Sequence, residues 1–333
     1  MSMKSIEARL RSNICVIFPG ALGDFICFMP ALQTLARDAK VDLFARSEFG
    51  ELMPEGVTVR TIESAAITAL FRAEWEKNEE AQRFFRDYDA VYSWFASGNW
   101  EFIRRLQATT GGVARVFPFR PARVEAHQSD YYLSCLDHRD GSAEPVLTLQ
   151  SEALRWCEEF WVSHALQRRS ILTIAPGSGA REKNWPVKFF QTVTQWWREK
   201  TGGRVLLLIG PVEQARGGIE LLRGNCIVAS DLSLSQAAAL LSRSDVYLGN
   251  DSGISHLAAA TGVRTLALFG SSDPRQWAPR GKKVMVLRRN LDCSPCQETT
   301  MKSCPHHACL TEFSPGEIIA ILAELPEVVT LTR

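Results

Sequence analysis

Apolar runs alternate with helical patterns along the whole chain. Residues 14–20 form a β-like apolar run, and residues 24–39 follow it with helical periodicity. The second half repeats this alternation from residue 171 onward, with one helix predicted over residues 213–222 and a last one over residues 315–325. Strands that alternate with helices predict βαβ units and parallel sheets. We therefore predict an α/β fold of Rossmann-like, doubly wound domains.

The length of the chain indicates two such domains, because 333 residues exceed what one hydrophobic core usually covers. We place the boundary in the helical segment before residue 161. This gives an N-terminal domain over residues 1–160 and a C-terminal domain over residues 161–333 that includes the terminal helix. Two domains that face each other across a cleft would bind ligands there, at the carboxyl ends of both sheets.

The charge balance excludes some partners. The chain carries 38 Lys and Arg against 37 Asp and Glu, a net charge of +1, which argues against nucleic acid as a partner. The apolar run at Ile14 is broken at Pro19 and Gly20, so it predicts neither a signal peptide nor a membrane span. We expect a cytoplasmic protein whose contact with a membrane is local and peripheral. The oligomeric state stays open.

The most informative segment is a strand-to-helix junction in the second half. The apolar run that ends at Leu248 gives way to Asn250, Asp251, Ser252 and Gly253, and an alanine-rich helical segment follows. The N–H groups and the dipole at such a helix start attract anions, such as a diphosphate. An ordinary capped turn would give the same pattern.

A second polar loop follows the strand predicted at residues 171–175. Gly177 and Gly179 permit a tight turn around Ser178, and Arg181 and Lys183 add positive charge. In a doubly wound domain this loop and the junction described above both lie at the carboxyl edge of the sheet. Their convergence favours an anion clamp over a solvated basic loop.

The first strand ends in a turn that places Asp24 at a helix start. The turn lacks both the G-x-G-x-x-G fingerprint and the Walker Gly-Lys-Ser/Thr sequence, which disfavours a nicotinamide-dependent oxidoreductase. Asp24 is either a first-turn acid that interacts with the helix dipole or a general base at the ligand edge of the sheet. The residues leave both interpretations open.

These three segments, in this order, resemble glycosyltransferase family 9, the ADP-heptose:lipopolysaccharide heptosyltransferases. The family's Asp-Ser/Thr-Gly-x-Ser-His element matches residues 251–256, its Lys-x-Trp-Pro element matches residues 183–186, and its Gly-Asp turn matches Gly23 and Asp24. The resemblance implies a GT-B fold and an inverting transfer of heptose from ADP-heptose to a lipopolysaccharide core or related glycolipid at the inner membrane surface. It implies no cofactor for catalysis.

The resemblance also assigns residues. Asp24 would be the catalytic base. The donor site would comprise nine residues of the second half: Ser178, Gly179, Lys183, Glu213, Leu232, Asp251, Ser252, Gly253 and His256. Among them, Glu213 would hold the ribose and Leu232 would lie against the base. The chain departs from the family at Gly179, where a second hydroxyl residue is common.

Four of the nine cysteines form a cluster over residues 293–309: Cys293, Cys296, Cys304 and Cys309. Their spacing makes the cluster a candidate structural zinc or iron site, since disulfides are unusual in the cytoplasm. The other five lie in apolar or helical stretches and are expected to be reduced core residues.

An acceptor with carboxylates and phosphates would need local positive charge. Arginine suits forked contacts with such groups, and the first half holds five candidates near the ends of predicted elements: Arg104, Arg105, Arg115, Arg120 and Arg123. Arg120 and Arg123 are the acceptor contacts we expect, although solvated surface arginines would look the same. Another nucleotide sugar, a protein acceptor and a non-catalytic sugar-nucleotide-binding protein remain alternatives.

Overall fold

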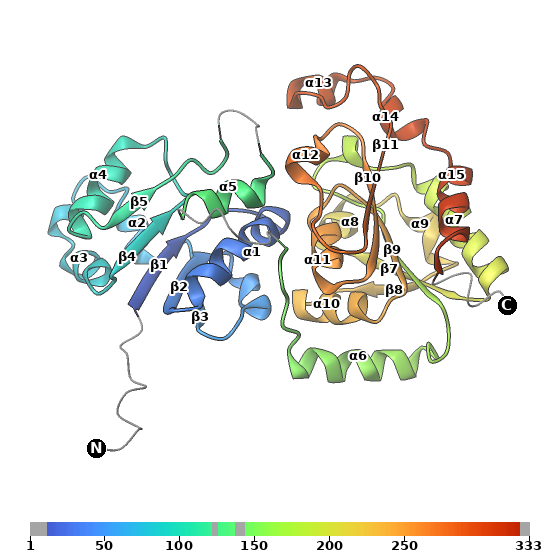
Figure 1. The fold of residues 1–333 in the computed structure, drawn as a ribbon, viewed down its shortest axis with the longest axis horizontal. Coiled ribbons are helices and arrows are strands. Elements are labelled where there is room, and N and C mark those ends of the chain that lie inside the picture. Colours follow the sequence, from blue (N-terminus) through green and yellow to red (C-terminus); the bar gives the residue numbers. More distant parts are fainter. Residues whose placement is uncertain (1–11, 122–125, 137–143, 327–333) are drawn as a thin grey trace. The chain divides into compact units, whose positions relative to one another are not determined.

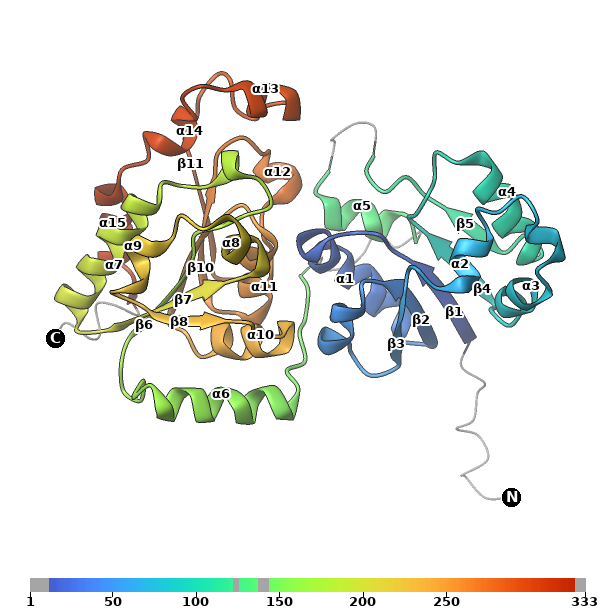
Figure 2. The same ribbon diagram turned by 180° about the vertical axis from the view of Figure 1, so that it is seen from behind.

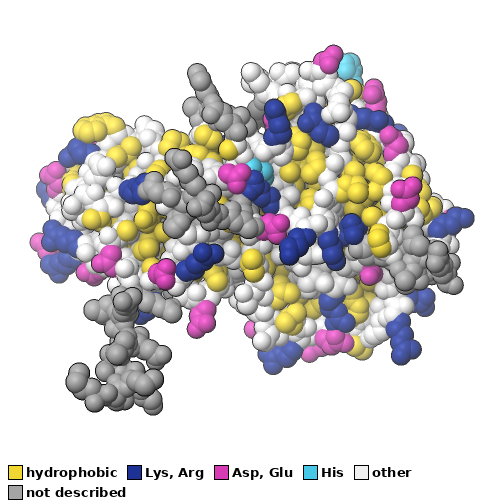
Figure 3. Space-filling view, viewed as in Figure 1, with side chains coloured by type: hydrophobic (Ala, Val, Ile, Leu, Met, Phe, Trp, Pro, Cys, Tyr) yellow, Lys and Arg dark blue, Asp and Glu magenta, His cyan; other side chains and the backbone are white. Residues whose placement is uncertain are grey.

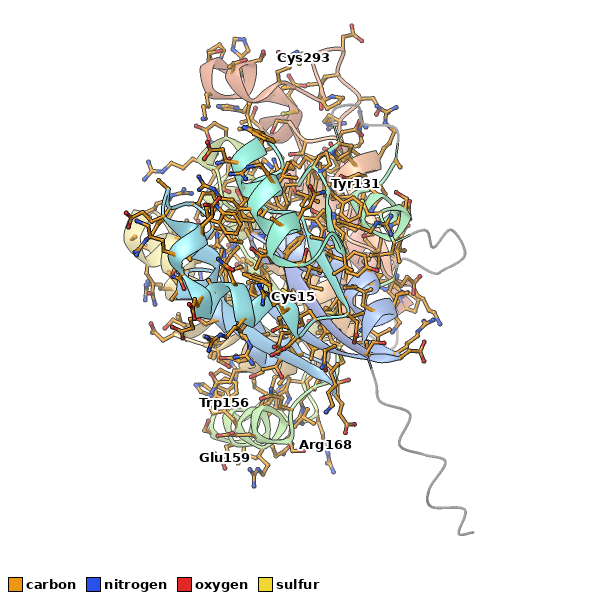
Figure 4. The ribbon with its side chains drawn as sticks, turned by 90° about the vertical axis from the view of Figure 1, so that its left-hand side faces the viewer. Cys15, Tyr131, Trp156, Glu159, Arg168 and Cys293 are labelled. Carbon is orange, nitrogen blue, oxygen red and sulfur yellow. The ribbon has the colours of Figure 1, made fainter. Side chains whose placement is uncertain are left out.

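The computed structural model describes residues 12–121, 126–136 and 144–326 and divides into two compact units (Figures 1 and 2). Unit 1 holds residues 1–124 and 128–142, and unit 2 holds residues 125–127 and 143–333. The sequence placed the boundary later, at residues 160–161. That position falls inside helix α6 (Ser151–Ser163), which packs against α10 (Leu234–Ser242) and belongs wholly to unit 2. Figure 4 labels Trp156 and Glu159 on this helix.

Unit 1 is built on a parallel sheet in the order β3-β2-β1-β4-β5. Its strands are β1 (Ser12–Ile17), β2 (Ala39–Ala45), β3 (Val57–Thr61), β4 (Ala90–Ser93) and β5 (Ala114–Val116). Its helices are α1 (Leu22–Ala36), α2 (Ala65–Ala69), α3 (Glu79–Arg86), α4 (Trp100–Thr109) and α5 (Gln128–Ser134), with 3-10 turns η2 (Ser47–Leu52) and η3 (Trp75–Lys77).

The two faces of this sheet have different cores. On the side of α1 and α5, Phe18 stacks on Phe28 with ring centroids 4.3 Å apart, and Trp94 and Tyr132 meet both rings edge-on. On the other side, aliphatic and phenylalanine side chains of α2, α3 and α4 cover the strands around Cys15, which Figure 4 labels. Both faces are apolar, as a parallel sheet requires, so functional side chains are confined to the strand ends.

Unit 2 has a parallel sheet in the order β11-β10-β9-β6-β7-β8. Its strands are β6 (Ile171–Ala175), β7 (Arg204–Ile209), β8 (Ile227–Ser230), β9 (Val246–Asn250), β10 (Arg264–Phe269) and β11 (Val284–Arg288). Besides α6 and α10, its helices are α7 (Val187–Thr201), α8 (Pro211–Arg216), α9 (Glu220–Arg223), α11 (Gly253–Thr261), α12 (Pro274–Trp277), α13 (Glu298–Ser303), α14 (Ala308–Thr311) and α15 (Pro315–Ala323), with the 3-10 turn η4 (Arg181–Lys183).

The strand order of unit 2 reverses between β6 and β9, which pair directly with Ala175 opposite Gly249. Ligands of doubly wound sheets bind at such a reversal, outside the carboxyl ends of the strands. The two loops singled out in the sequence follow β6 and β9. The sheet therefore brings them together at the position where an anion site is expected.

Two helix predictions differ in outcome. The terminal helix is confirmed, because α15 begins at Pro315 and the Ser314 and Glu317 side chains form a capping box there. The single helix predicted over residues 213–222 is wrong. Gly217 and Gly218 both adopt positive φ angles, 63° and 83°, and end α8 before α9 begins.

No helix among the described residues combines the length and apolar character needed to cross a membrane. On the face drawn in Figure 3, Lys and Arg side chains are interspersed with Asp and Glu. This mixture agrees with the net charge of +1.

Candidate functional site

The junction between β9 and α11 is organised by buried hydroxyl and amide groups. The Asn250 side chain donates to Pro176 O at 2.7 Å and accepts the Trp185 N–H at 2.9 Å, so it ties the junction to the loop after β6. The Ser255 hydroxyl donates to Asn250 O at 2.5 Å. With these contacts made internally, the first turn of α11 at Gly253 presents backbone N–H groups at the sheet edge.

The loop after β6 holds its shape through Ser178. The Ser178 hydroxyl donates to Ala180 O at 2.7 Å and lies 2.6 Å from Asn184 Oδ1, and the residue is only 5% exposed. Its hydroxyl is thus used inside the loop. Gly179 is exposed, and a side chain there would meet open space, so packing does not require a glycine at this position.

Lys183 and Asp251 connect the loop to the junction. Lys183 Nζ lies 2.8 Å from Asp251 Oδ2, and the two side chains are 30% and 11% exposed. The carboxylate fixes the ammonium group beside the start of α11. A cation and a helix N-terminus then lie at the same sheet edge, which suits a diphosphate.

Glu213 lies against the backbone of the same loop. Its Oε2 accepts the Gly210 N–H at 2.9 Å, and a Cβ on Gly177 would lie 1.7 Å from its Oε1. Gly177 is therefore required by the close approach of this carboxylate. The structure brings Glu213 beside the predicted diphosphate loop, which the sequence spacing could not show.

Arg216 was missed by sequence reasoning. From the last turn of α8 its guanidinium donates to Ser178 O at 3.1 Å and to Gly179 O at 3.0 Å. The forked guanidinium thus holds the predicted diphosphate loop by two carbonyls. Its position three residues after Glu213 carried no signal of this contact.

His256 is buried near the junction. It is 4% exposed, and burial lowers its pKa to about 4; Asp251 opposes this shift, while His127 and Lys183 add to it. The ring is therefore neutral near pH 7. His127, a second residue that the sequence did not single out, lies 2.8 Å from Ala278 O through its Nε2.

We expect the stability of the protein to fall between about pH 6.5 and pH 4 in part because of His256. The unfolded chain binds a proton in this window and the folded chain does not, so unfolding becomes easier as the pH falls. The contribution is about 3 kcal/mol. Urea unfolding across this range should show a shallower pH dependence for His256→Gln. His164→Gln, at an exposed histidine, is the control and should keep the wild-type dependence. Equal slopes for wild type and His256→Gln would contradict the assignment.

In unit 1, Asp24 is both a capping acid and a group near a cation. Its Oδ2 accepts the Ala21 N–H at 3.3 Å, and its Oδ1 lies 3.4 Å from Arg120 Nη2. Its side chain is 12% exposed, whereas Arg120 is 58% exposed. A Cβ on Gly20 would lie 2.7 Å from Asp24 Cβ, so the tight turn needs glycine there. Thus Oδ2 caps the start of α1, and Oδ1 lies near the exposed guanidinium of Arg120.

The remaining predicted residues differ in their surroundings. Arg105 is 6% exposed and donates to Leu70 O at 3.1 Å, so it is a core residue rather than a surface contact. Arg104 and Arg115 lie over the aromatic rings of Trp100 and Phe117. Arg123 is outside the described residues. In unit 2, Leu232 is half-buried just before α10.

The four clustered cysteines gather beside the carboxyl end of β10. Burial and the thiols of Cys293 and Cys304 raise the pKa of Cys296, whose N–H donates to Ser271 O at 2.7 Å. Figure 4 labels Cys293 in the segment that leads to α13. Within the described ranges, no group of three or more His, Cys, Asp or Glu is arranged to hold a metal ion. None of the nine cysteines, all of which are described, forms a disulfide.

The two Rossmann-like units, with a strand-to-helix junction that suits an anion in one and a carboxylate at a helix start in the other, fit the GT-B class of glycosyltransferases. The model of glycosyltransferase family 9 (heptosyltransferase) matches residues 128–306, more than half of the chain. The chain belongs to this family, and the predicted GT-B fold and enzyme class are confirmed.

Individual proteins support the same conclusion. The chain is 25% identical to lipopolysaccharide heptosyltransferase 1 of Pseudomonas aeruginosa over 86% of its length and 87% of that protein. The family 9 glycosyltransferase of Veillonella parvula is similar in structure, with a TM-score of 0.75, 19% identity and coverage of 96% and 98% of the two chains. The E. coli ADP-heptose lps heptosyltransferase II has a TM-score of 0.70 at 18% identity, covering 96% and 99%.

An iron-containing relative bears on the cysteine cluster. The dodecameric, iron-containing glycosyltransferase TibC of enterotoxigenic E. coli has a TM-score of 0.65 at 15% identity, covering 96% of this chain and 77% of its own. At this identity the likeness concerns the fold. It gives no ligand set for the cysteines of this chain.

Proposed function

We propose that this enzyme transfers heptose from ADP-heptose to a lipopolysaccharide core sugar, with inversion at the anomeric carbon. The observation that carries the proposal is the ion pair between Lys183 and Asp251 at the start of α11, 2.8 Å long, where a diphosphate would bind. We infer heptose as the sugar and lipopolysaccharide as the acceptor from the names of the relatives from P. aeruginosa and E. coli. Their acceptor is a glycolipid, so we place the enzyme at the inner face of the cytoplasmic membrane.

The donor would be held by groups of unit 2 that the structure brings to one sheet edge. Lys183 and the first N–H groups of α11, at Gly253, would bind the diphosphate. Ser252 occupies the N-cap position of this helix without a capping hydrogen bond from its side chain, and the backbone of Gly179 is exposed beside it. The Glu213 carboxylate would accept hydrogen bonds from the ribose hydroxyl groups. Leu232 would contact the base, and neutral His256 would donate a hydrogen bond without adding charge.

Asp24 would supply the base. Its carboxylate would take the proton from an acceptor hydroxyl while that oxygen attacks the anomeric carbon and the bond to the diphosphate breaks. The leaving ADP carries the developing negative charge, which Lys183 and the α11 helix start would stabilise. Arg120, whose Nη2 lies 3.4 Å from Asp24 Oδ1, would contact an acidic group of the acceptor. We propose Arg123 as a second acceptor contact.

No divalent cation takes part in this scheme. The charge on the leaving diphosphate would be met by an ammonium group and backbone N–H groups, which play the part that a metal ion plays elsewhere. We give the cysteine cluster, residues 293–309, a structural role at the end of β10 and no part in the sugar chemistry.

The test is a donor panel assayed for sugar transfer with a chelator present throughout. We expect ADP-heptose to be consumed and ADP released at the same rate with and without EDTA. UDP-glucose and GDP-mannose, which share the diphosphate but differ in both base and sugar, should be turned over at least tenfold more slowly. Equal use of all three donors would overturn the ADP-heptose assignment, and loss of activity in EDTA would overturn the metal-independent scheme.

A further inference from the structure

A cavity of about 670 Å³ in unit 1 is not used by the site described so far. It lies at the carboxyl edge of the sheet, because its walls follow the ends of neighbouring strands. Arg46 and Glu48 come after β2, Glu63 comes after β3, and Phe95 comes after β4. Ala45 and Thr61 pair across β2 and β3, so the segments that follow them start side by side. The cavity is therefore a product of the sheet register.

The turn that carries Asp24 forms part of the same cavity. Pro19 lines it, and this residue lies between the end of β1 and the start of α1. A molecule bound in the cavity would contact the turn from which the Asp24 carboxylate extends. This links the cavity to the transfer reaction.

The apolar wall of the cavity contains an exposed aromatic ring. Phe71 is 44% exposed, yet its ring is held by two others. It stacks on Phe102 with centroids 5.0 Å apart and meets Phe95 edge-on at 5.7 Å. The ring is therefore fixed in position while much of its surface is open. A pyranose has an apolar face of C–H groups that covers such a ring and removes it from water.

The charged part of the lining consists of one cation and two anions. Arg46, Glu48 and Glu63 are exposed, and none of them forms an ion pair with another described residue. Carboxylates accept hydrogen bonds from hydroxyl groups, and a guanidinium donates to hydroxyl oxygens. Two carboxylates against one guanidinium repel a ligand that carries its own carboxylate or phosphate.

We propose that this cavity binds an uncharged sugar unit of the acceptor, with Phe71 under its apolar face and Arg46, Glu48 and Glu63 on its hydroxyls. The inference rests on the proposed function and narrows its acceptor. The sugar that enters the cavity is a neutral polyol, and acidic groups of the acceptor lie outside it. Binding of a neutral sugar in this cavity is separate from the contacts between acidic acceptor groups and Arg120 and Arg123 that the sequence led us to expect.

Saturation-transfer NMR with the full chain tests the proposal. The probes are methyl α-D-mannopyranoside, which is neutral, and methyl α-D-glucopyranosiduronate, which has a carboxylate. We expect the neutral glycoside to bind at least tenfold more tightly than the uronate. Phe71→Ala should weaken neutral-glycoside binding about tenfold. Trp100→Ala removes another exposed ring, 69% exposed and outside the cavity, and should leave it unchanged.

A charge-reversing variant makes the test independent of the aromatic ring. Glu63→Lys should raise the affinity for the uronate relative to the neutral glycoside, because it changes the lining to two cations and one anion. Tighter binding of the uronate by the wild-type protein would overturn the proposal, and so would an unchanged preference in Glu63→Lys or equal effects of Phe71→Ala and Trp100→Ala. ADP calorimetry on the same samples separates the two hypotheses. Normal ADP binding without glycoside binding removes only this inference, whereas absent ADP binding removes the proposed function.

Discussion

Replacing Asp24 with asparagine is expected to lower sugar transfer by about 10²- to 10⁴-fold, the usual contribution of a general base. The asparagine side chain keeps an oxygen that can accept the Ala21 N–H, the contact that Asp24 makes at 3.3 Å. The cap of α1 is therefore retained while the base is lost. Asp24→Ala removes both, so it should also cost about 1 kcal/mol of stability.

A cap acid elsewhere in the chain is the matched control. Glu317 occupies the same third position of α15 and accepts the Ser314 N–H at 2.8 Å, so Glu317→Gln changes a capping box away from the proposed chemistry. Steady-state transfer and thermal unfolding are measured for each variant. If Asp24→Asn retained the wild-type kcat, the residue would be a cap and nothing more.

The sequence was sufficient to predict the strand ends. Parallel strands buried on both faces give continuous apolar runs. The ends of two strands could therefore be predicted from the points where these runs stop, at Pro176 and Asn250. These points place Lys183 and Asp251 at one sheet edge, and the structure joins them in an ion pair. Local pattern and sheet topology together were enough for this part of the site.

Contacts between distant segments were not predictable in the same way. Arg216 reaches Ser178 O across 38 positions of the chain, and neither residue type signals the other. The cavity of unit 1 likewise joins residues that follow four different strands, β1 to β4, and only the sheet register brings them together. The structural role of Arg105, by contrast, could have been predicted from local sequence spacing. Glu101 lies one helical turn before it, and this spacing could have indicated a paired, structural arginine.

Removing the Lys183 side chain is expected to weaken ADP binding by roughly 1.5 to 3 kcal/mol, or about 10- to 150-fold. Two effects act in the same direction. The diphosphate loses a charged hydrogen bond, and Asp251, whose side chain is 11% exposed, is left without the cation that lies 2.8 Å from it. An unpaired carboxylate beside the diphosphate then repels it.

A double-mutant cycle separates these two effects by calorimetry. If repulsion by Asp251 contributes, Lys183→Ala combined with Asp251→Asn should bind ADP more tightly than Lys183→Ala alone, and the difference is the coupling energy. Lys188→Ala removes the same charge from an exposed position on α7 and should leave ADP affinity unchanged. An ADP affinity in Lys183→Ala equal to that of Lys188→Ala would place the diphosphate elsewhere in unit 2. The start of α11 would then be an ordinary capped turn, the alternative that its sequence always allowed.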